Sequence, residues 1–272
     1  MGSTTRGCIA ANMKMRTDWH KAISDDSHLP PEAARELHDN GFTIVPGPAM
    51  PGGPDQYSIA YDRDVAAADP SDVSVRSSTR IDDFVNRGHE FDGIYTFGPL
   101  LTACAKIIGR PFKLSGMRAR TLESGAPAEA LHIDVKRGAK EWPIVGGILM
   151  VDVFTADNGA TRFVPGSHLW PSDPKEYISN PKAPHEQQVL ACGPAGSLII
   201  FNASTWHGHT GNRSGTRRRS IQAHFVARDA QDATHHGTRM RSETMQRIDG
   251  LARYVLGVEC AAQQTHAASR DT

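Results

Sequence analysis

The pattern of hydrophobic and polar positions predicts helices in the first hundred residues and many short strands after them. A helix is expected over 31–40, because prolines open it and Gly41 follows it. The apolar segment 42–45 then has the character of a strand. A second helix is expected over 99–108, where the apolar residues fall on one face. A last helix is predicted over 242–256.

From residue 112 onward, short apolar stretches alternate with glycine, proline and other turn residues. The candidate strands are 112–122, 144–154, 160–164, 187–192, 196–202 and 218–227. Many short strands joined in this way favour a barrel or a jelly roll. The stretch 46–79 is rich in proline, glycine, aspartate and serine, and we expect long loops there.

A single domain is enough to account for the chain. Its 272 residues can bury a sizeable core, and all-β barrels of this size commonly form one domain. We expect that domain over residues 29–260. Residues 1–28 are polar without clear periodicity and are predicted to form a flexible arm. Residues 261–272 are predicted to be a disordered tail.

The composition limits the partners that the protein can bind and the cellular compartment in which we expect it. Thirty basic residues balance thirty acidic ones, so no net charge attracts the chain to nucleic acid or to an anionic membrane. No stretch approaches the roughly 20 apolar residues of a membrane span. The four cysteines are far apart and form no C-x-x-C pair, which disfavours a zinc ribbon and a disulfide framework. We therefore expect a cytoplasmic protein with reduced thiols.

Three side chains are candidate metal ligands. His132 and Asp134 are two residues apart, and on an extended segment such residues point to the same face. His207 lies shortly after the predicted strand 196–202 and can supply a third ligand. Two histidines and one carboxylate on one face of an octahedral metal are the ligand set of non-haem iron(II) oxygenases. Three positions stay open, two for the keto acid 2-oxoglutarate and one for O2.

Arg218 is a candidate for binding the far carboxylate of 2-oxoglutarate. Arginine suits this role because its planar guanidinium group binds a carboxylate through two parallel hydrogen bonds. Arg218 lies on the predicted strand 218–227, which follows the loop after His207 and can point back toward the same site. Arg217 and Arg219 are expected to face the other side of that strand.

The order of these motifs resembles the phytanoyl-CoA dioxygenase family, which belongs to the iron(II)/2-oxoglutarate oxygenases. His-x-Asp at 132–134 is followed by Asn-Gly-Ala-Thr at 158–161 and by Pro-Gly-Ser-His at 165–168. His-Gly at 207–208 then precedes Arg218, which stands eleven residues after that histidine.

The resemblance extends from about residue 41 to about residue 226 and is strongest over 131–219. The stretches 154–161 and 251–257 are most similar to the branch that modifies natural products. The family implies a mainly β fold with flanking helices, a double-stranded β-helix of the cupin-like jelly-roll type. It also implies an iron(II)/2-oxoglutarate-dependent dioxygenase that hydroxylates a small organic molecule in secondary metabolism, releasing succinate and CO2.

The resemblance also implies roles for individual residues. By position, the iron ligands are His132, Asp134 and His207. Arg218 holds the C5 carboxylate of 2-oxoglutarate, and Thr161 is a second contact to that cosubstrate.

Some residues of this region leave alternatives open. Glu129 stands where the branch that modifies natural products often has a glutamine that contacts the cosubstrate. Two adjacent carboxylates repel each other, so we expect Glu129 to face the substrate or the solvent. His209 shares the strand parity of His207 and is the rival third ligand. Arg118 and Arg120 alternate with apolar residues, and we expect one of them to line the pocket, where it could bind an acidic substrate.

Two other classes of protein remain as alternatives. One is a cupin-like metal enzyme, an isomerase or a dioxygenase, that does not use 2-oxoglutarate and gives Arg218 no role. The other is a non-catalytic binding protein, which the intact set of ligands disfavours. A halogenase is disfavoured because Asp134 fills the position that such enzymes leave for a halide. The identity of the substrate, the type of oxidation and the oligomeric state stay open.

Overall fold

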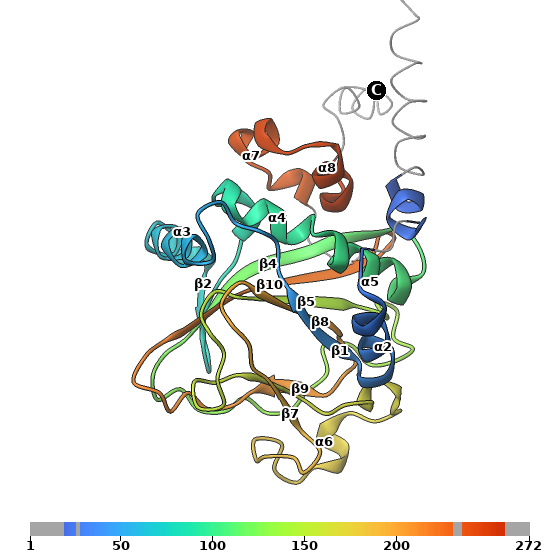
Figure 1. Ribbon diagram of the computed structural model, residues 1–272, viewed down its shortest axis with the longest axis vertical. Coiled ribbons are helices and arrows are strands. Elements are labelled where there is room, and N and C mark those ends of the chain that lie inside the picture. Colours follow the sequence, from blue (N-terminus) through green and yellow to red (C-terminus); the bar gives the residue numbers. More distant parts are fainter. Residues whose placement is uncertain (1–18, 26–27, 231–235, 259–272) are drawn as a thin grey trace, which may run out of the picture.

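The computed structural model describes residues 19–25, 28–230 and 236–258. These residues form two antiparallel β-sheets that face each other, and most of the helices lie on the outer side of the larger sheet (Figure 1). This is a mainly β fold with flanking helices, as a double-stranded β-helix requires.

The described part of the chain forms a seven-stranded sheet of order β1-β8-β5-β10-β4-β3-β2 and a three-stranded sheet of order β7-β6-β9. The strands are β1 (Phe42–Pro46), β2 (Val73–Val75), β3 (Thr79–Ile81), β4 (Phe112–Leu122), β5 (Val145–Met150), β6 (Thr161–Phe163), β7 (Val189–Ala191), β8 (Ser197–Asn202), β9 (His207–His209) and β10 (Arg218–Ala227). Neighbouring strands come from distant parts of the sequence, so the sheets bring the predicted motifs together.

The helices lie mainly before the first long strand and at the end of the described chain. They are α2 (Pro31–Asn40), α3 (Asp55–Ala66), α4 (Asp92–Tyr95), α5 (Gly98–Ile108), α6 (Pro174–Tyr177), α7 (Ser242–Arg247) and α8 (Gly250–Leu256). Short 3-10 turns occur at Pro70–Asp72, Phe84–Asn86, His89–Phe91, Ser167–Leu169 and His236–Thr238. No helix in the described residues is long and apolar enough to cross a membrane.

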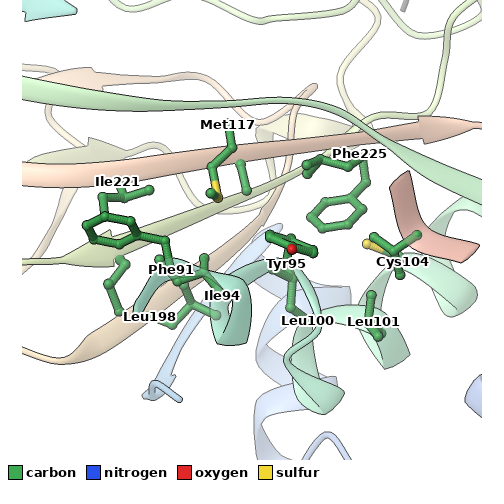
Figure 2. Close-up of a cluster of buried hydrophobic side chains, with 14 of the residues drawn as sticks. Phe91, Ile94, Tyr95, Leu100, Leu101, Cys104, Met117, Leu198, Ile221 and Phe225 are labelled. Carbon is green, nitrogen blue, oxygen red and sulfur yellow. The ribbon is translucent and has the colours of Figure 1, made fainter. Parts of the chain in front are cut away.

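The main hydrophobic core lies between the large sheet and the helices that cover it (Figure 2). Tyr95 of α4, Leu100 and Cys104 of α5 and Phe225 of β10 are fully buried there. α5 contacts four strands of the sheet, namely β4, β5, β8 and β10. Because burial of one such side chain contributes roughly 1.5–3 kcal/mol, this layer supports the large sheet from behind.

A β-bulge in β4 determines which of its side chains face the smaller sheet. The core-facing residues of β4 are Phe112, Leu114, Met117 and Ala119. Their spacing changes parity once, where the register with β10 shifts between His224 and Phe225. A bulge inserts one extra residue and thereby reverses the alternation of faces. Arg118 and Arg120 therefore point away from the helices and toward a pocket between the sheets.

The helices predicted over 31–40 and 99–108 are confirmed within one residue by α2 and α5. The prediction of long loops over 46–79 was wrong, because α3 and β2 lie in this stretch. α3 forms because Tyr57, Ala60 and Tyr61, at helical spacing, are buried against the core.

The single helix predicted over 242–256 was also wrong. It is divided into α7 and α8, and the Asp249 side chain accepts a hydrogen bond from the backbone N–H of Ala252 (2.8 Å), which begins a new helix.

The structure describes part of the predicted arm and none of the predicted tail. Residues 19–25 of the expected arm are helical, and Ile23 packs into the core. The rest of that arm, apart from residue 28, and the tail 261–272 lie outside the described residues.

Between the sheets, Gly146 of β5 makes room for an aromatic ring that supports the candidate metal site. It pairs with Phe201 of β8, and a Cβ atom at Gly146 would lie 2.2 Å from ring carbons of Phe201. The ring centroid of Phe201 is in turn 4.9 Å from that of His207. A glycine is therefore required at this position by packing.

We expect Gly146→Ala to lower the free energy of unfolding by about 1–3 kcal/mol, because the methyl group must displace the Phe201 ring. Chemical denaturation measures the change. Gly116→Ala is the matched control, since nothing lies within 4 Å of its Cβ position, and it should change stability by less than about 0.5 kcal/mol. Equal losses in both variants would contradict the packing argument.

Candidate functional site

The structure brings His132, Asp134 and His207 together, and their possible ligand atoms all lie within 4.8 Å of one another. His132 Nε2 is 3.7 Å from Asp134 Oδ1, and His207 Nε2 is 3.6 Å from Asp134 Oδ2. His132 precedes Asp134 on an irregular segment, whereas His207 begins β9 of the small sheet. The three side chains predicted as ligands therefore converge on one point.

Backbone pairing holds the two histidines next to each other. His132 and His207 form an antiparallel bridge, with backbone N–H to carbonyl distances of 2.9 Å and 3.0 Å. The backbone N–H of Asp134 donates to the carbonyl of Ala203 (2.9 Å). The ligand segment is thus attached to His207, the first residue of β9, and to Ala203 before it. The ligand positions therefore depend on main-chain geometry.

Further hydrogen bonds select the ring nitrogens that face a metal. Nδ1 of His132 lies 2.9 Å from the carbonyl of Ala130, and Nδ1 of His207 lies 2.8 Å from that of Thr205. A carbonyl only accepts hydrogen bonds, so each Nδ1 carries the proton and each Nε2 presents a lone pair. This arrangement is usual for metal-binding histidines. The donor set therefore fits a divalent transition metal.

The charge states of these groups also suit metal binding. Burial lowers the pKa of His207 to about 4, so its ring is neutral at pH 7. Burial alone would raise the pKa of Asp134, but His207, His224 and His132 outweigh it and hold the pKa well below its ordinary range. The neutral imidazole of His207 and the ionised carboxylate of Asp134 need no deprotonation before they bind a cation.

His224 is a neighbour of the ligands that the sequence analysis missed. Its Nε2 lies 3.5 Å from Asp134 Oδ2, and it lines the same pocket as the three ligands. It comes from β10, and Arg218 and Gln222, which have the same parity on that strand, line the pocket as well. The shared parity can be seen in the sequence, but a single histidine within a strand belongs to no recognisable motif and so gave no reason to select it.

His209 is not part of the group of candidate ligands. Its Nδ1 lies 2.8 Å from the carbonyl of Thr210, and its Nε2 lies 3.4 Å from Ser77 Oγ and 3.9 Å from Glu129 Oε2. The His209 ring therefore lines the pocket beside the candidate metal site, and His207 remains the predicted third ligand.

Arg218 and Thr161 both line the pocket that contains the ligands. Arg218 is 2% exposed and stacks over the ring of Phe154, with 4.3 Å from its central carbon to the ring centroid. Its Nη1 donates to Ser220 Oγ (3.2 Å). Burial and the like charge of Arg120 lower the pKa of Arg218. The buried cation is thus poorly compensated by the protein itself.

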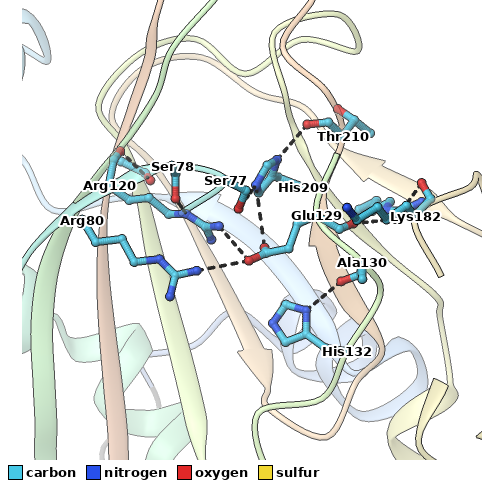
Figure 3. A network of polar contacts seen from close by, with 12 residues as sticks. Ser77, Ser78, Arg80, Arg120, Glu129, Ala130, His132, Lys182, His209 and Thr210 are labelled. Carbon is cyan, nitrogen blue, oxygen red and sulfur yellow. Dashed lines mark hydrogen bonds and ion pairs between the residues drawn. The ribbon is translucent and has the colours of Figure 1, made fainter. Parts of the chain in front are cut away.

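Glu129 faces the same pocket, but it is neither protonated nor turned toward solvent. Arg80 Nη2 and Arg120 Nη2 both donate to its Oε1, at 3.1 Å and 2.9 Å (Figure 3). Burial alone would raise its pKa, but Arg120, His132 and His209 outweigh it and lower the pKa to about 2. The sequence analysis did not foresee that Arg80 and Arg120 bind the Glu129 carboxylate.

Arg162, another residue that the sequence analysis missed, holds the ligand segment from behind. It is 1% exposed, and its guanidinium group donates to the carbonyls of Glu129 (2.8 Å), Pro181 (2.9 Å) and Ala183 (2.6 Å). An arginine between Thr161 and Phe163 gave no signal in the sequence, because most of its partners are backbone atoms of distant segments.

A jelly roll with two histidines and one carboxylate facing an enclosed pocket defines the class of non-haem iron oxygenases. Comparison with known proteins agrees with this class. Residues 114–220 match the family model described as phytanoyl-CoA dioxygenase (PhyH). Over these residues, which are less than half of the chain, it is similar to the phytanoyl-CoA dioxygenase family of iron(II)- and 2-oxoglutarate-dependent dioxygenases.

Curated relatives include fungal dioxygenases. Dioxygenase trt7 of Aspergillus terreus is 28% identical over 210 residues, which cover 71% of this chain and 71% of that protein. Dioxygenase cdmA of Talaromyces verruculosus is 32% identical over 108 residues, or 37% of this chain and 35% of that protein. The second match thus spans about a third of its relative.

Solved structures confirm the fold. The non-heme alpha ketoglutarate dependent carbocyclase SnoK, from nogalamycin biosynthesis, superposes with a TM-score of 0.62 at 15% identity and covers 79% of this chain and 92% of that one. EctD from S. alaskensis gives a TM-score of 0.60 at 15% identity, over 74% and 78%. The predicted double-stranded β-helix is therefore confirmed.

We expect His224→Ala to weaken the binding of Fe(II) or Co(II) by roughly 10- to 100-fold, because groups that orient a metal ligand commonly have effects of this size. Anaerobic titration of the metal-free protein measures the affinity. Gln222→Ala is the control, since Gln222 lines the same pocket but forms no hydrogen bond with His132, Asp134 or His207 among the described residues. Unchanged affinity in His224→Ala would show that His224 does not orient Asp134.

We expect the free energy of unfolding of the metal-free protein to fall as the pH is lowered from about 6.5 to about 4. Histidines titrate near 6.5 in an unfolded chain, whereas burial lowers the pKa values of His207, His209 and His236 to about 4. Between these values the unfolded chain binds more protons, so acid favours unfolding. Above about pH 7 these groups add no pH dependence.

Denaturation at a series of pH values tests this. His236→Gln removes one such histidine away from the metal site and should make the decline shallower. A stability that stays constant from pH 7 to pH 5 would contradict the expectation.

Proposed function

We propose that His132, Asp134 and His207 bind iron(II), and that the protein uses 2-oxoglutarate and O2 to hydroxylate a small organic molecule. The overall reaction converts the substrate, 2-oxoglutarate and O2 into the alcohol, succinate and CO2. Bound iron(II) supplies the activation of O2. One oxygen atom enters succinate and the other enters the substrate.

The observation that carries this proposal is the unpaired charge of Arg218. Its neighbours Arg217 and Arg219 form ion pairs with Asp62 and Asp152. Arg218 itself is buried and forms no ion pair with a carboxylate of the described residues, and its Nε has no hydrogen-bond partner. A buried cation without a counter-ion is costly. An anionic ligand in the same pocket as the metal ligands relieves that cost.

A dicarboxylic keto acid fits this arrangement. Its far carboxylate can bind the guanidinium fork of Arg218, while its other end reaches the metal ligands that line the same pocket. Thr161, which is 6% exposed on β6, offers a hydroxyl group to the cosubstrate. Ile148 and Phe201 supply apolar surface that excludes water from the reacting groups.

The names of similar proteins support a role in natural-product biosynthesis. SnoK is described as an enzyme of nogalamycin biosynthesis. HygX from Streptomyces hygroscopicus, with a TM-score of 0.58 at 13% identity, was solved with nickel, 2-oxoglutarate and hygromycin B bound. We propose that this chain likewise acts on a free small molecule.

We expect the wild-type protein, supplied anaerobically with Fe(II) and 2-oxoglutarate, to develop the weak visible metal-to-ligand charge-transfer band of the bound cosubstrate. In Arg218→Gln the concentration of 2-oxoglutarate for half-maximal absorbance should rise on the order of 100-fold, because loss of a buried charge partner costs about 2–5 kcal/mol. The matched control is Arg217→Gln, which alters an arginine with a half-exposed side chain. Its titration should resemble that of the wild type.

A wild-type protein that binds iron but gives no band would contradict the use of 2-oxoglutarate. It would favour a cupin-like metal enzyme that needs no cosubstrate. A band with equal affinity in both proteins would leave the cosubstrate in place but reject Arg218 as its anchor.

A further inference from the structure

The pocket has more positive than negative side chains. It is lined by four arginines and two carboxylates, namely Arg80, Arg118, Arg120, Arg218, Glu129 and Asp134. If it holds iron(II) and 2-oxoglutarate as proposed above, their charges cancel each other. Two arginine charges therefore have no matching carboxylate within the pocket, which makes it attractive to a further anion.

Two of these arginines are held directly opposite each other. Arg80 of β3 and Arg120 of β4 are cross-strand partners in the antiparallel register. Like charges in such positions destabilise a sheet unless an anion lies between them. Both guanidinium groups donate to one oxygen atom, Oε1 of Glu129 (Figure 3). One carboxylate thus serves two cations.

The arginines differ in how many of their hydrogen-bond donors are engaged. Arg120 has an 8% exposed side chain and is held twice, by Ser78 Oγ at its Nε (2.8 Å) and by Glu129. Arg80 has a 21% exposed side chain, and among the described residues its guanidinium group donates to one side chain, that of Glu129. Its Nε is buried without a partner. Arg80 therefore has N–H groups available to a ligand, whereas Arg120 already donates hydrogen bonds to Ser78 and Glu129.

Arg118 lies nearer the opening of the same pocket. It is two residues from Arg120 on the same face of β4, and its side chain is 37% exposed. Its Nε is 3.3 Å from Asp82, whose side chain is 54% exposed. Such solvent-exposed pairs contribute little stability, so a ligand can replace Asp82 at small cost. Residues placed diagonally across two strands, as Arg80 and Arg118 are, can both reach one group.

We propose that Arg80 and Arg118 form a binding site for a carboxylate group of the organic substrate. The substrate of this protein is then an organic acid, and its carboxylate binds on the side of the pocket formed by β3 and β4. The planar guanidinium fork matches a carboxylate in shape and charge. Ile148 and Phe201 provide apolar surface for the rest of the molecule. This inference rests on the proposed function, since iron(II) and 2-oxoglutarate are taken to occupy the remainder of the pocket.

Ligand-observed NMR with benzoate and benzamide as probes tests the proposal. The two molecules share a ring and differ in the charge of one planar group. The protein is loaded with Zn(II), which does not change oxidation state, and with saturating 2-oxoglutarate, so that benzoate cannot enter the site of the cosubstrate. We expect the wild type to bind benzoate roughly tenfold more tightly than benzamide, as a charge-assisted hydrogen bond predicts.

Arg118→Gln and Arg80→Gln should each remove most of this preference, because each removes one of the two cations. Arg118→Lys should retain part of it, since the charge is kept and the planar fork is lost. Arg217→Gln should keep the wild-type preference. Thermal unfolding of each variant shows whether it is folded, and Arg118→Gln, which alters a partly exposed residue, carries the test if Arg80→Gln does not fold.

Equal binding of the two probes by the wild type, or no binding of either, would overturn the proposal, as would a preference that both glutamine variants retain. The charge-transfer titration with Fe(II) and 2-oxoglutarate separates this failure from a failure of the proposed function. If Arg118→Gln binds 2-oxoglutarate as the wild type does, the arginine site is distinct from the cosubstrate site. A large loss of 2-oxoglutarate affinity in Arg118→Gln would assign Arg118 to the cosubstrate instead and reject the proposal.

Discussion

The site depends on the backbone pairing between His132 and His207. Two hydrogen bonds, of 2.9 Å and 3.0 Å, place the two residues side by side although 75 positions separate them in the chain. The bridge aligns two imidazole rings, and carbonyl groups of the adjacent backbone select the tautomer of each. Since main-chain atoms make these contacts, the ligand geometry is as rigid as the small sheet itself. The helices behind the large sheet and the Phe201 ring in front of it support this arrangement.

The second organising feature is a set of cations that the protein alone does not neutralise. Arg218 is buried without a carboxylate partner, and Arg80 and Arg120 share one oxygen atom of Glu129. Such an arrangement lowers the stability of the ligand-free protein. It is consistent with a pocket whose anions arrive as ligands, the cosubstrate at the deep end and an acidic substrate toward the opening. Glu129 belongs to this charge network, because Arg80 and Arg120 both donate to its Oε1.

Several features could not be read from the sequence, for reasons that are physical. Residues 46–79 have the composition of loops, yet Tyr57 and Tyr61 form a helix because tertiary contacts bury them. The break between α7 and α8 requires Asp249 to cap a new helix within a segment of continuous periodicity. Arg162 and His224 have no motif, because their partners are a distant loop and a carboxylate on another segment. In contrast, the bulge in β4 does leave a trace in the sequence, because the apolar positions of that strand change parity once.

The sequence alone determined the class of fold, the candidate iron ligands and the candidate anchor for 2-oxoglutarate. It could do so because these depend on residue type, on spacing by two along the chain and on the order of motifs. The tertiary structure brought His207, and not His209, into the cluster of candidate ligands. It also showed that both Arg118 and Arg120 face the pocket and placed Arg80 beside them. Those outcomes depend on which strands become neighbours and on the register between them. Register is set by packing over the whole sheet, and no local segment contains that information.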